Sequence, residues 1–512
     1  MKRSILLLLV TSLLSATTFA QKPATPETPA PKKDDAPVMT RSLNMDSRVV
    51  TKNEVTIRGQ RVPYQATAGT IPVFDEEGKA VAGVFFTFFE RSDVTDRTSR
   101  PLVISFNGGP GTASVWMMLG YTGPRLLKID DEGFPVQPYG TRENPQSILD
   151  VADIVYVDPV NTGFSRHNLS KDAAASRFFG VNADIKYLAD WINTFVSRYN
   201  RWASPKYLIG ESYGTTRVSG LALQLQNVHW MYLNGVILVS PTDLGLKRDG
   251  PAQGALKLPY MAATAWYQKA LAPDLQQKDL TAMLPDVEKF TLEEYMPALA
   301  MAGSLTDQKR KDIAAKVARY SGLSEKAVLQ NNLDVPINFF WKELLRDKGF
   351  TVGRLDSRYR GIDGKDAGMA PDYNSELTSW LHSFTPAINM FMREELNYKN
   401  DLNYYMFGPV RPWDDSNNQT GENLRQAMAQ NPFLHLLVQS GYYDGACDYF
   451  NAKYNMWQMD AGGKLKDRME WEGYRSGHMM YLRKDDLATS NDHLRQFIRK
   501  TMPVKTTQPA KY

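Results

Sequence analysis

The stretch Lys206-Tyr207-Leu208-Ile209-Gly210-Glu211-Ser212-Tyr213-Gly214 joins two elements of different kinds. Its apolar residues 207–209 predict a buried strand, and residues 215–226 predict a helix. A tight turn from a strand into a helix needs small residues on both sides of its apex, and Gly210 and Gly214 meet that need. We therefore predict a strained turn that exposes Ser212 as a nucleophile. The alternative is an ordinary turn with a solvent-facing serine.

Short apolar runs alternate with helical patterns on both sides of this turn. The runs that predict strands are 84–89, 101–106, 152–157, 206–209, 233–239, 433–439 and, more weakly, 469–472. A helical pattern covers residues 185–195, and a closing helix is predicted over 491–500. This alternation is typical of a mostly parallel sheet covered on both faces. With the turn at Ser212, it predicts the α/β class and the α/β-hydrolase fold.

One long segment interrupts the alternation. Residues 246–395 show helices and loops without a convincing buried strand, with Thr306 as a helix N-cap and residues 355–366 as a loop. We interpret this segment as a mainly helical insertion, or cap. The hydrolase domain then comprises residues 42–245 and 396–502, and a tail covers 503–512.

The N-terminus has the pattern of an export signal. Lys2 and Arg3 precede an apolar run over residues 5–14, and small and polar residues follow as far as Ala20. This predicts a signal peptide over 1–20, cleaved after Ala20, because the run is too short for a lasting membrane anchor. The alternative is an uncleaved anchor. Residues 21–41 are rich in Pro, Ala, Thr and Lys and predict a flexible linker.

The amino-acid composition limits the cellular locations and the binding partners that can be expected. Cys447 is the only cysteine, which excludes an intramolecular disulfide and favours the bacterial periplasm or exterior over a eukaryotic secretory route. The net charge of +4 is small for 512 residues, so no nucleic-acid partner is expected. The six histidines are scattered and no His-Glu-x-x-His motif occurs, so no metal or other cofactor is expected.

A serine nucleophile requires a base, and histidine is the usual one. In this fold the chain order is serine, acid, histidine. His478 follows Ser476-Gly477 in a loop after a strand candidate, which is the expected position. Asp444 lies in the turn after the strand 433–439 and is the predicted acid. Asp448 is its rival, although it also fits the N-cap of the next helix.

The oxyanion of an acyl-transfer reaction needs backbone N–H donors that are already in place. Tyr213, the residue after the nucleophile, supplies one predicted donor. The second should come from Asn107-Gly108-Gly109-Pro110-Gly111, which ends a strand and whose glycines permit close approach of the backbone. We choose Gly109. The alternative is a plain turn.

Several blocks, taken in order, resemble the serine carboxypeptidase family. They are Asn107-Gly108-Gly109-Pro110-Gly111 with Gly123-Pro124, Val157-Asp158-Pro159-Val160-Asn161-Thr162-Gly163-Phe164-Ser165, Gly210-Glu211-Ser212-Tyr213-Gly214, and Ser440-Gly441-Tyr442-Tyr443-Asp444 with Gly477-His478-Met479. The resemblance implies a triad of Ser212, Asp444 and His478, and an oxyanion hole formed by Gly109 and Tyr213. It also implies a peptide substrate with a free C-terminus.

The resemblance further implies how that C-terminus is held. Asn107, Gly108 and Glu211 fall on groups that hold the substrate carboxylate in the family. There a second Glu shares a proton with the one before the serine, which favours acid pH. Here Tyr121 occupies the matching position. Its hydroxyl could donate to a carboxylate, but it cannot share a proton in the same way.

Something must therefore offset the charge of Glu211 beside a bound carboxylate. One answer is that Glu211 is protonated. The other is a cation from the insertion, for which Arg354, Arg358 and Arg360 are candidates. The plainer interpretation of these arginines is a solvated loop paired with acids such as Asp356 and Asp363.

Three functions are consistent with these residues. The first is an exported hydrolase that releases C-terminal amino acids from peptides through an acyl-enzyme on Ser212. The second is an esterase or acyltransferase on the same scaffold, since ester and amide chemistry share the triad. The third is a non-catalytic envelope binding protein, which an intact triad disfavours.

Overall fold

The computed structural model describes residues 41–246 and 248–503. The predicted signal peptide, nearly all of the linker and nearly all of the tail lie outside these residues. One compact unit covers the chain from Ser42 onward. No helix among the described residues has the length and apolar character needed to cross a membrane.

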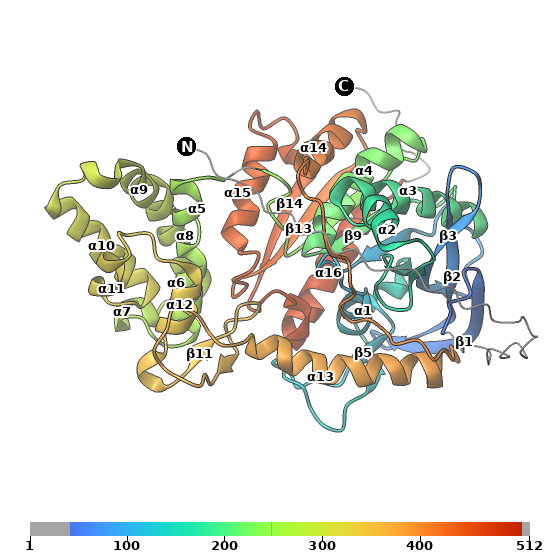
Figure 1. Cartoon of the computed structure of the whole chain (residues 1–512), viewed down its shortest axis with the longest axis horizontal. Coiled ribbons are helices and arrows are strands. Elements are labelled where there is room, and N and C mark those ends of the chain that lie inside the picture. The colour runs from blue at the N-terminus through green and yellow to red at the C-terminus, as the bar shows by residue number, and fades with distance from the viewer. Residues whose placement is uncertain (1–40, 247, 504–512) are drawn as a thin grey trace, which may run out of the picture. The chain divides into compact units, whose positions relative to one another are not determined.

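A ten-stranded sheet forms the centre of this unit, in the order β1-β2-β3-β7-β4-β9-β10-β13-β14, with β8 paired to β3 (Figure 1). The strands are β1 (Ser47–Ile57), β2 (Gln60–Phe74), β3 (Ala80–Arg91), β4 (Leu102–Phe106), β7 (Asp153–Asp158), β8 (Arg166–His167), β9 (Lys206–Glu211), β10 (Gly235–Val239), β13 (His435–Gly441) and β14 (Met469–Tyr474). The six from β7 to β14 pair in parallel, and β1, β2 and β3 pair antiparallel. Two short pairs, β5 (Arg125–Leu127) with β6 (Thr141–Glu143) and β11 (Thr351–Val352) with β12 (Arg360–Gly361), lie outside it. The predicted α/β-hydrolase fold is confirmed.

The central strands are apolar throughout because both of their faces are covered. In β10, Val236 and Leu238 join the core on one face, and Ile237 and Val239 join the core on the other. The first face is covered by α2 (Lys171–Phe178), α3 (Val181–Arg198), α4 (Tyr213–Val228), α14 (Thr420–Gln430) and α15 (Tyr449–Met459). The second is covered by α1 (Val115–Met117), η1 (Met118–Thr122), α13 (Ser375–Met390), η8 (Met480–Leu482) and α16 (Lys484–Thr501). Apolar runs of this kind therefore predict position in the sheet as well as strand content.

The sequence did not reveal the long hairpin of β1 and β2. Strand β1 alternates half-exposed and exposed residues over most of its length, and it pairs on one side only. An edge strand needs no continuous apolar run, so the pattern that identified the central strands is missing. The hairpin extends the sheet away from the Ser212 turn.

The insertion has a hydrophobic core of its own, built from residues of α5 to α12 together with Tyr442, Tyr443, Tyr449 and Phe450. Its helices are α5 (Pro251–Ala255), α6 (Leu258–Tyr267), α7 (Pro273–Gln276), α8 (Leu280–Phe290), α9 (Met296–Met301), α10 (Asp307–Ser321), α11 (Glu325–Gln330) and α12 (Ile337–Glu343). Figure 1 shows them gathered at one side of the sheet, near α15 and β14. Thr306 caps α10 as predicted, since its side chain accepts a hydrogen bond from Lys309 N.

The predicted end of the cap at residue 395 requires correction. Helix α13 lies within the segment 246–395, but its residues Trp380, Phe384 and Ile388 pack in the main core with residues of α1 and η8. The expected loop at 355–366 also contains the short strand β12. The structural cap therefore ends before α13, because the apolar face of that helix is buried by the hydrolase domain.

Candidate active site

Ser212 lies at the apex of a sharp turn between β9 and α4. Its φ of 57° and ψ of −128° place a non-glycine residue in a strained conformation. A Cβ at Gly210 would lie 2.2 Å from Gly214 O, and one at Gly214 would lie 2.8 Å from Phe106 O. Both glycines are therefore required by close backbone contacts. The turn has the geometry of a nucleophile elbow.

Asp444 and His478 form a hydrogen-bonded pair. His478 Nδ1 lies 2.7 Å from Asp444 Oδ2, and both side chains are buried. A carboxylate only accepts hydrogen bonds, so Nδ1 carries the hydrogen and Nε2 is left as the acceptor that a general base needs. Burial lowers the pKa of His478, but the charge of Asp444, its hydrogen bond and the charge of Glu211 outweigh this and raise that pKa overall.

The structure separates the two acid candidates. Asp444 Oδ1 accepts backbone N–H groups of Ala446 and Cys447, which leaves Oδ2 directed to His478. Asp448 is the N-cap of α15, and its side chain accepts a hydrogen bond from Asn451 N. The hydrogen bonds of the two carboxylates thus support Asp444 as the acid and a helix-capping role for Asp448.

The glycine-rich loop after β4 packs directly against the nucleophile turn. A Cβ at Gly108 would lie 2.5 Å from Tyr213 N and 2.9 Å from Ser212 Cβ. Gly109 has a φ of 103°, a conformation that favours glycine. The backbone around Gly109 and Tyr213 is thus brought together beside Ser212, where a predicted oxyanion hole must lie.

An arginine that the sequence analysis did not single out holds this loop. Arg217, on α4, is buried and forms an ion pair with Asp184 at 2.7 Å. Its guanidinium also donates to Asn107 O at 2.7 Å. Helix α4 therefore positions both the nucleophile at its start and the loop opposite. An arginine on a predicted helix gives no sequence signal for such a role.

The block at residues 157–165 also supports the loop. Asp158 Oδ1 accepts a hydrogen bond from Ser114 N at 2.8 Å, and Ser114 Oγ donates to Val157 O. Asn107 N in turn donates to Ser114 Oγ at 3.2 Å. Burial raises the pKa of Asp158 to about 7, although the Ser114 hydrogen bond acts against the shift. Through Ser114, the block at residues 157–165 thus helps to position the backbone of Asn107.

Glu211 is buried beside the nucleophile. Asn107 Nδ2 donates to its Oε1 at 3.0 Å, and the Tyr481 hydroxyl donates to its Oε2. Burial raises the pKa of Glu211 to about 7, although the charge of His478 and the two hydrogen bonds hold it lower than burial alone would. The carboxyl group is therefore protonated in weakly acidic solution.

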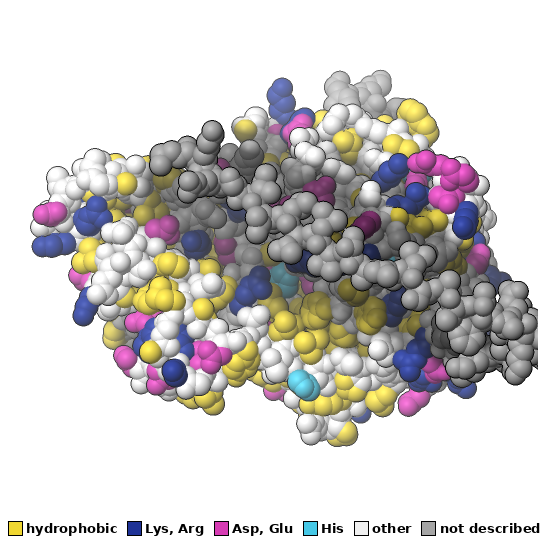
Figure 2. All heavy atoms as spheres, viewed as in Figure 1, with side chains coloured by type: hydrophobic (Ala, Val, Ile, Leu, Met, Phe, Trp, Pro, Cys, Tyr) yellow, Lys and Arg dark blue, Asp and Glu magenta, His cyan; other side chains and the backbone are white. Residues whose placement is uncertain are grey.

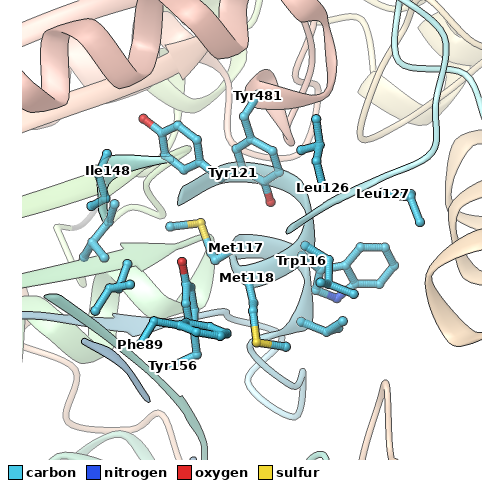
Figure 3. Close-up of a cluster of buried hydrophobic side chains, with 14 of the residues drawn as sticks. Phe89, Trp116, Met117, Met118, Tyr121, Leu126, Leu127, Ile148, Tyr156 and Tyr481 are labelled. Carbon is cyan, nitrogen blue, oxygen red and sulfur yellow. The ribbon is translucent and has the colours of Figure 1, made fainter. Parts of the chain in front are cut away.

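Tyr121 does not occupy the position expected of a substrate ligand. It is fully buried, its hydroxyl donates to Gln439 Oε1 at 2.7 Å, and its ring stacks on Tyr481 at 4.8 Å. Figure 3 shows the two rings side by side with their hydroxyls on different sides. These contacts do not support the substrate-binding assignment of Tyr121. Tyr481, which follows the base, is the tyrosine that contacts Glu211, and only three-dimensional structure could reveal this exchange.

Part of the insertion lies between the acid and base loops. His478 N donates to Leu355 O at 2.6 Å, and Gly445 N donates to Arg354 O at 2.9 Å. Arg358 forms a buried ion pair with Asp356 at 2.7 Å and donates to Ser476 Oγ at 3.0 Å. We call residues 353–360 the bracket. It links the two triad loops from the side of the insertion.

The three candidate arginines have different surroundings. Arg358 is paired with Asp356, as the plainer interpretation anticipated, and Arg360 is exposed and donates to Gln268 Oε1 at 2.9 Å. Asp363 pairs with Lys342 and not with an arginine of this group. Arg354 is exposed and has no carboxylate partner within the described part of the chain.

The metal-ligating side chains that cluster in the described residues belong to this same site. Asp444, Cys447 and His478 present ligand atoms within 4.8 Å of one another. Two of the three are the acid–base pair itself, so a metal ion held there would compete with the hydrogen bond between them. The arrangement fits proton transfer better than metal binding.

Comparisons with known proteins identify the family that part of this chain matches. Residues 58–243 match the model of the serine carboxypeptidase family. Serine carboxypeptidase-like 31 of Arabidopsis thaliana is 30% identical over 168 residues, which are 31% of this chain and 30% of that protein. Serine carboxypeptidase-like 45 of the same plant is 30% identical over 216 residues, covering 39% of this chain and 42% of the relative. The match thus spans less than half the length of these relatives.

The fold has a counterpart among solved structures. The prohormone-processing carboxypeptidase Kex1 from Saccharomyces cerevisiae superimposes with a TM-score of 0.51 at 16% identity, over 85% of this chain and 91% of that one. At this identity the likeness shows the fold alone. The resemblance drawn from the sequence motifs is confirmed for the matched segment, which contains Ser212 but neither Asp444 nor His478.

Proposed function

We propose that this chain, whose residues 58–243 match the serine carboxypeptidase family, releases amino acids from the C-terminus of peptides. One observation carries the proposal. The Asp444–His478 pair lies outside the matched segment, yet the same loop brings Tyr481 onto Glu211, the residue before Ser212. This contact supports the placement of Ser212 and the Asp444–His478 pair in one site.

The reaction follows from the roles of these groups. His478 Nε2 takes the proton of Ser212 Oγ as the oxygen attacks the scissile carbonyl carbon. The oxyanion of the tetrahedral intermediate faces the N–H groups of Tyr213 and Gly109. His478 then gives the proton to the leaving amine, and the C–N bond breaks to leave an ester on Ser212. Water, activated by the same base, hydrolyses that ester and restores the serine.

Glu211 and Asn107 supply the preference for a free C-terminus. A protonated Glu211 can donate a hydrogen bond to the substrate carboxylate, whereas two charged carboxylates would repel. Its raised pKa, about 7, keeps this donor available below neutrality without a second glutamate. Binding of the substrate's terminal carboxylate is therefore compatible with a tyrosine, Tyr121, at the position of the family's second glutamate.

An esterase or acyltransferase is the second candidate. The observation that favours it is the same departure, because Tyr121 replaces the glutamate that shares a proton in the family and is itself turned to Gln439. A site with one carboxyl group selects less strictly for a terminal carboxylate than a site with two. Ester substrates would pass through the same acyl-enzyme on Ser212.

A mass-spectrometric assay separates the candidates. The protein is incubated across pH with a peptide mixture, its C-terminally amidated counterparts and simple esters, with Ser212→Ala as the control. We expect stepwise loss of C-terminal residues from free acids only, reduced by several orders of magnitude in the variant. Cleavage of esters without any shortening of peptides would instead establish the esterase.

Export is the last part of the proposal. The charged start, the apolar run and Ala20 support removal of residues 1–20, and the single cysteine supports a bacterial periplasmic or extracellular location. N-terminal sequencing of the protein recovered outside the cytoplasm should begin at Gln21. An intact Met1 in the membrane fraction would contradict it.

A further inference from the structure

Arg354 lies where the insertion meets both triad loops. Its backbone oxygen accepts the Gly445 N–H at 2.9 Å, and the next residue, Leu355, accepts the His478 N–H at 2.6 Å. The position of its Cα is thus fixed by the acid loop on one side and by the base loop on the other. The backbone of Arg354 therefore lies beside the loops of both Asp444 and His478.

The guanidinium of Arg354 is free to bind a ligand. The other two arginines of the bracket are held by Asp356 and by Gln268, whereas Arg354 is exposed and makes no ion pair with another described residue. Its positive charge nevertheless acts to lower the pKa of His478. On the face shown in Figure 2, a histidine side chain lies beside Lys or Arg side chains near the centre.

An open pocket of about 640 Å³ adjoins this side chain. It is lined by Gly445 and Ala446 of the acid loop and by Asn338 and Asn374. Asp372 also borders it and is exposed, with its Oδ2 accepting the Gly364 N–H at 2.9 Å. The pocket therefore brings Arg354, two asparagines and the carboxylate of Asp372 beside the loop that carries the predicted acid.

We propose that Arg354 binds a carboxylate of the peptide substrate in this pocket and so gives the enzyme a preference for acidic peptides. A guanidinium and a carboxylate match through two parallel hydrogen bonds, and amide donors complete such a site. The carboxylate is an Asp or Glu side chain of the substrate next to the scissile bond, since the terminal α-carboxylate is already assigned to Asn107 and Glu211. This inference rests on the proposed peptidase function.

Steady-state kinetics on paired peptides test the proposal. The pairs differ only by Glu or Gln at the last or the penultimate position, and each also has a C-terminally amidated form. Arg354→Gln should raise KM for the Glu peptide by roughly ten- to a hundredfold and leave its Gln partner within about threefold. Equal weakening of all free acids, with the amides unaffected, would show that Arg354 binds the α-carboxylate instead and would overturn the proposal.

Two variants make the result specific. Arg360→Gln is the matched control, because it removes an exposed arginine of the same bracket whose partner is a glutamine. Arg354→Glu should invert the preference toward Lys-containing peptides, which a loss of folding cannot do. Equal KM changes for Glu, Gln and amidated peptides in Arg354→Gln, or no inversion in Arg354→Glu, would overturn the proposal.

Direct binding separates this inference from the proposed function. The affinities of Ser212→Ala for the same peptides are compared with those of Ser212→Ala/Arg354→Gln. A parent protein that shortens no peptide would refute the peptidase proposal, while charge-dependent binding that vanishes in the double variant would still support the Arg354 site. Identical affinities in the two backgrounds would refute the site even in an active peptidase.

Discussion

The hydroxyl of Tyr481 donates a hydrogen bond to the carboxylate of Glu211, the residue that precedes Ser212. The base loop and the nucleophile turn are therefore joined by a contact separate from the catalytic side chains. Because this hydrogen bond favours the ionised form of Glu211, it lowers a pKa that burial has raised. Together with burial and the charge of His478, the tyrosine thereby influences the pH at which the neighbouring carboxyl group gains its charge.

Tyr481→Phe should shift the pH dependence of substrate binding. Loss of the hydrogen bond raises the pKa of Glu211 further, so KM for free-acid peptides should begin to rise at a higher pH than in the parent. Tyr121→Phe is the control, because Tyr121 is stacked on Tyr481 but donates to Gln439. KM measured from pH 5 to 9 checks this, and superimposable profiles for Tyr481→Phe and the parent would contradict it.

The raised pKa of Glu211 predicts that the binding of free-acid peptides weakens as the pH rises through about 7. Below that pH the carboxyl group is neutral and donates, and above it the charge repels the substrate carboxylate. Glu211→Gln should remove this dependence. Since Glu211 and His478 influence each other, the apparent values belong to the pair.

The same raised pKa has a consequence for stability. A carboxyl group whose pKa is higher in the folded state stabilises the fold below its unfolded pKa, and that contribution is lost as the pH rises through about 7. Glu211→Gln should therefore gain stability over the parent on going from pH 5 to pH 8. Thermal unfolding at the two pH values checks the sign. A difference in Tm that stays the same at the two pH values would show that Glu211 ionises as freely in the folded state as in the unfolded state.

Asp444→Asn should cost on the order of 10⁴ in kcat, as loss of the corresponding carboxylate does in serine proteases, because the histidine then adopts the wrong tautomer. Asp448→Asn is the matched control. Asparagine is an equally good N-cap, so α15 should remain intact and kcat should stay close to that of the parent. A larger loss in Asp448→Asn than in Asp444→Asn would reverse the choice of acid.

Arg358→Met should destabilise the protein by about 3–5 kcal/mol, since it leaves the buried Asp356 without its partner. It should also lower kcat, because Ser476 of the base loop loses a hydrogen bond. Urea unfolding checks the first effect. The double variant Arg358→Met/Asp356→Leu should recover much of the stability, whereas equal losses in both variants would mean that the buried charge is not the cause.

Local pattern was enough to predict the nucleophile turn and the central strands. A Gly-x-Ser-x-Gly motif between an apolar strand and a helix leaves few other geometries, and strands buried on both faces are apolar throughout. His478 and Asp444 were predicted because the order of the triad leaves few candidates among six histidines. Each of these inferences used contacts between neighbours in sequence or a fixed chain order.

Contacts between residues that are far apart in the sequence could not be predicted from local patterns or from chain order. Tyr481 and Glu211 are 270 positions apart, and nothing in either neighbourhood shows that they meet. Arg217 and the Asp356–Arg358 pair are charged residues whose composition fits a solvated surface, yet all three are buried. The polar edge strand β1 was missed for the related reason that an edge needs no apolar signature.

The bracket makes the insertion a structural part of the catalytic apparatus. Since Leu355 binds the backbone of His478 and Arg354 binds that of Gly445, folding of the insertion and alignment of the base are thermodynamically linked. A related hydrolase could not exchange this segment as an independent module without carrying residues 353–360 with it.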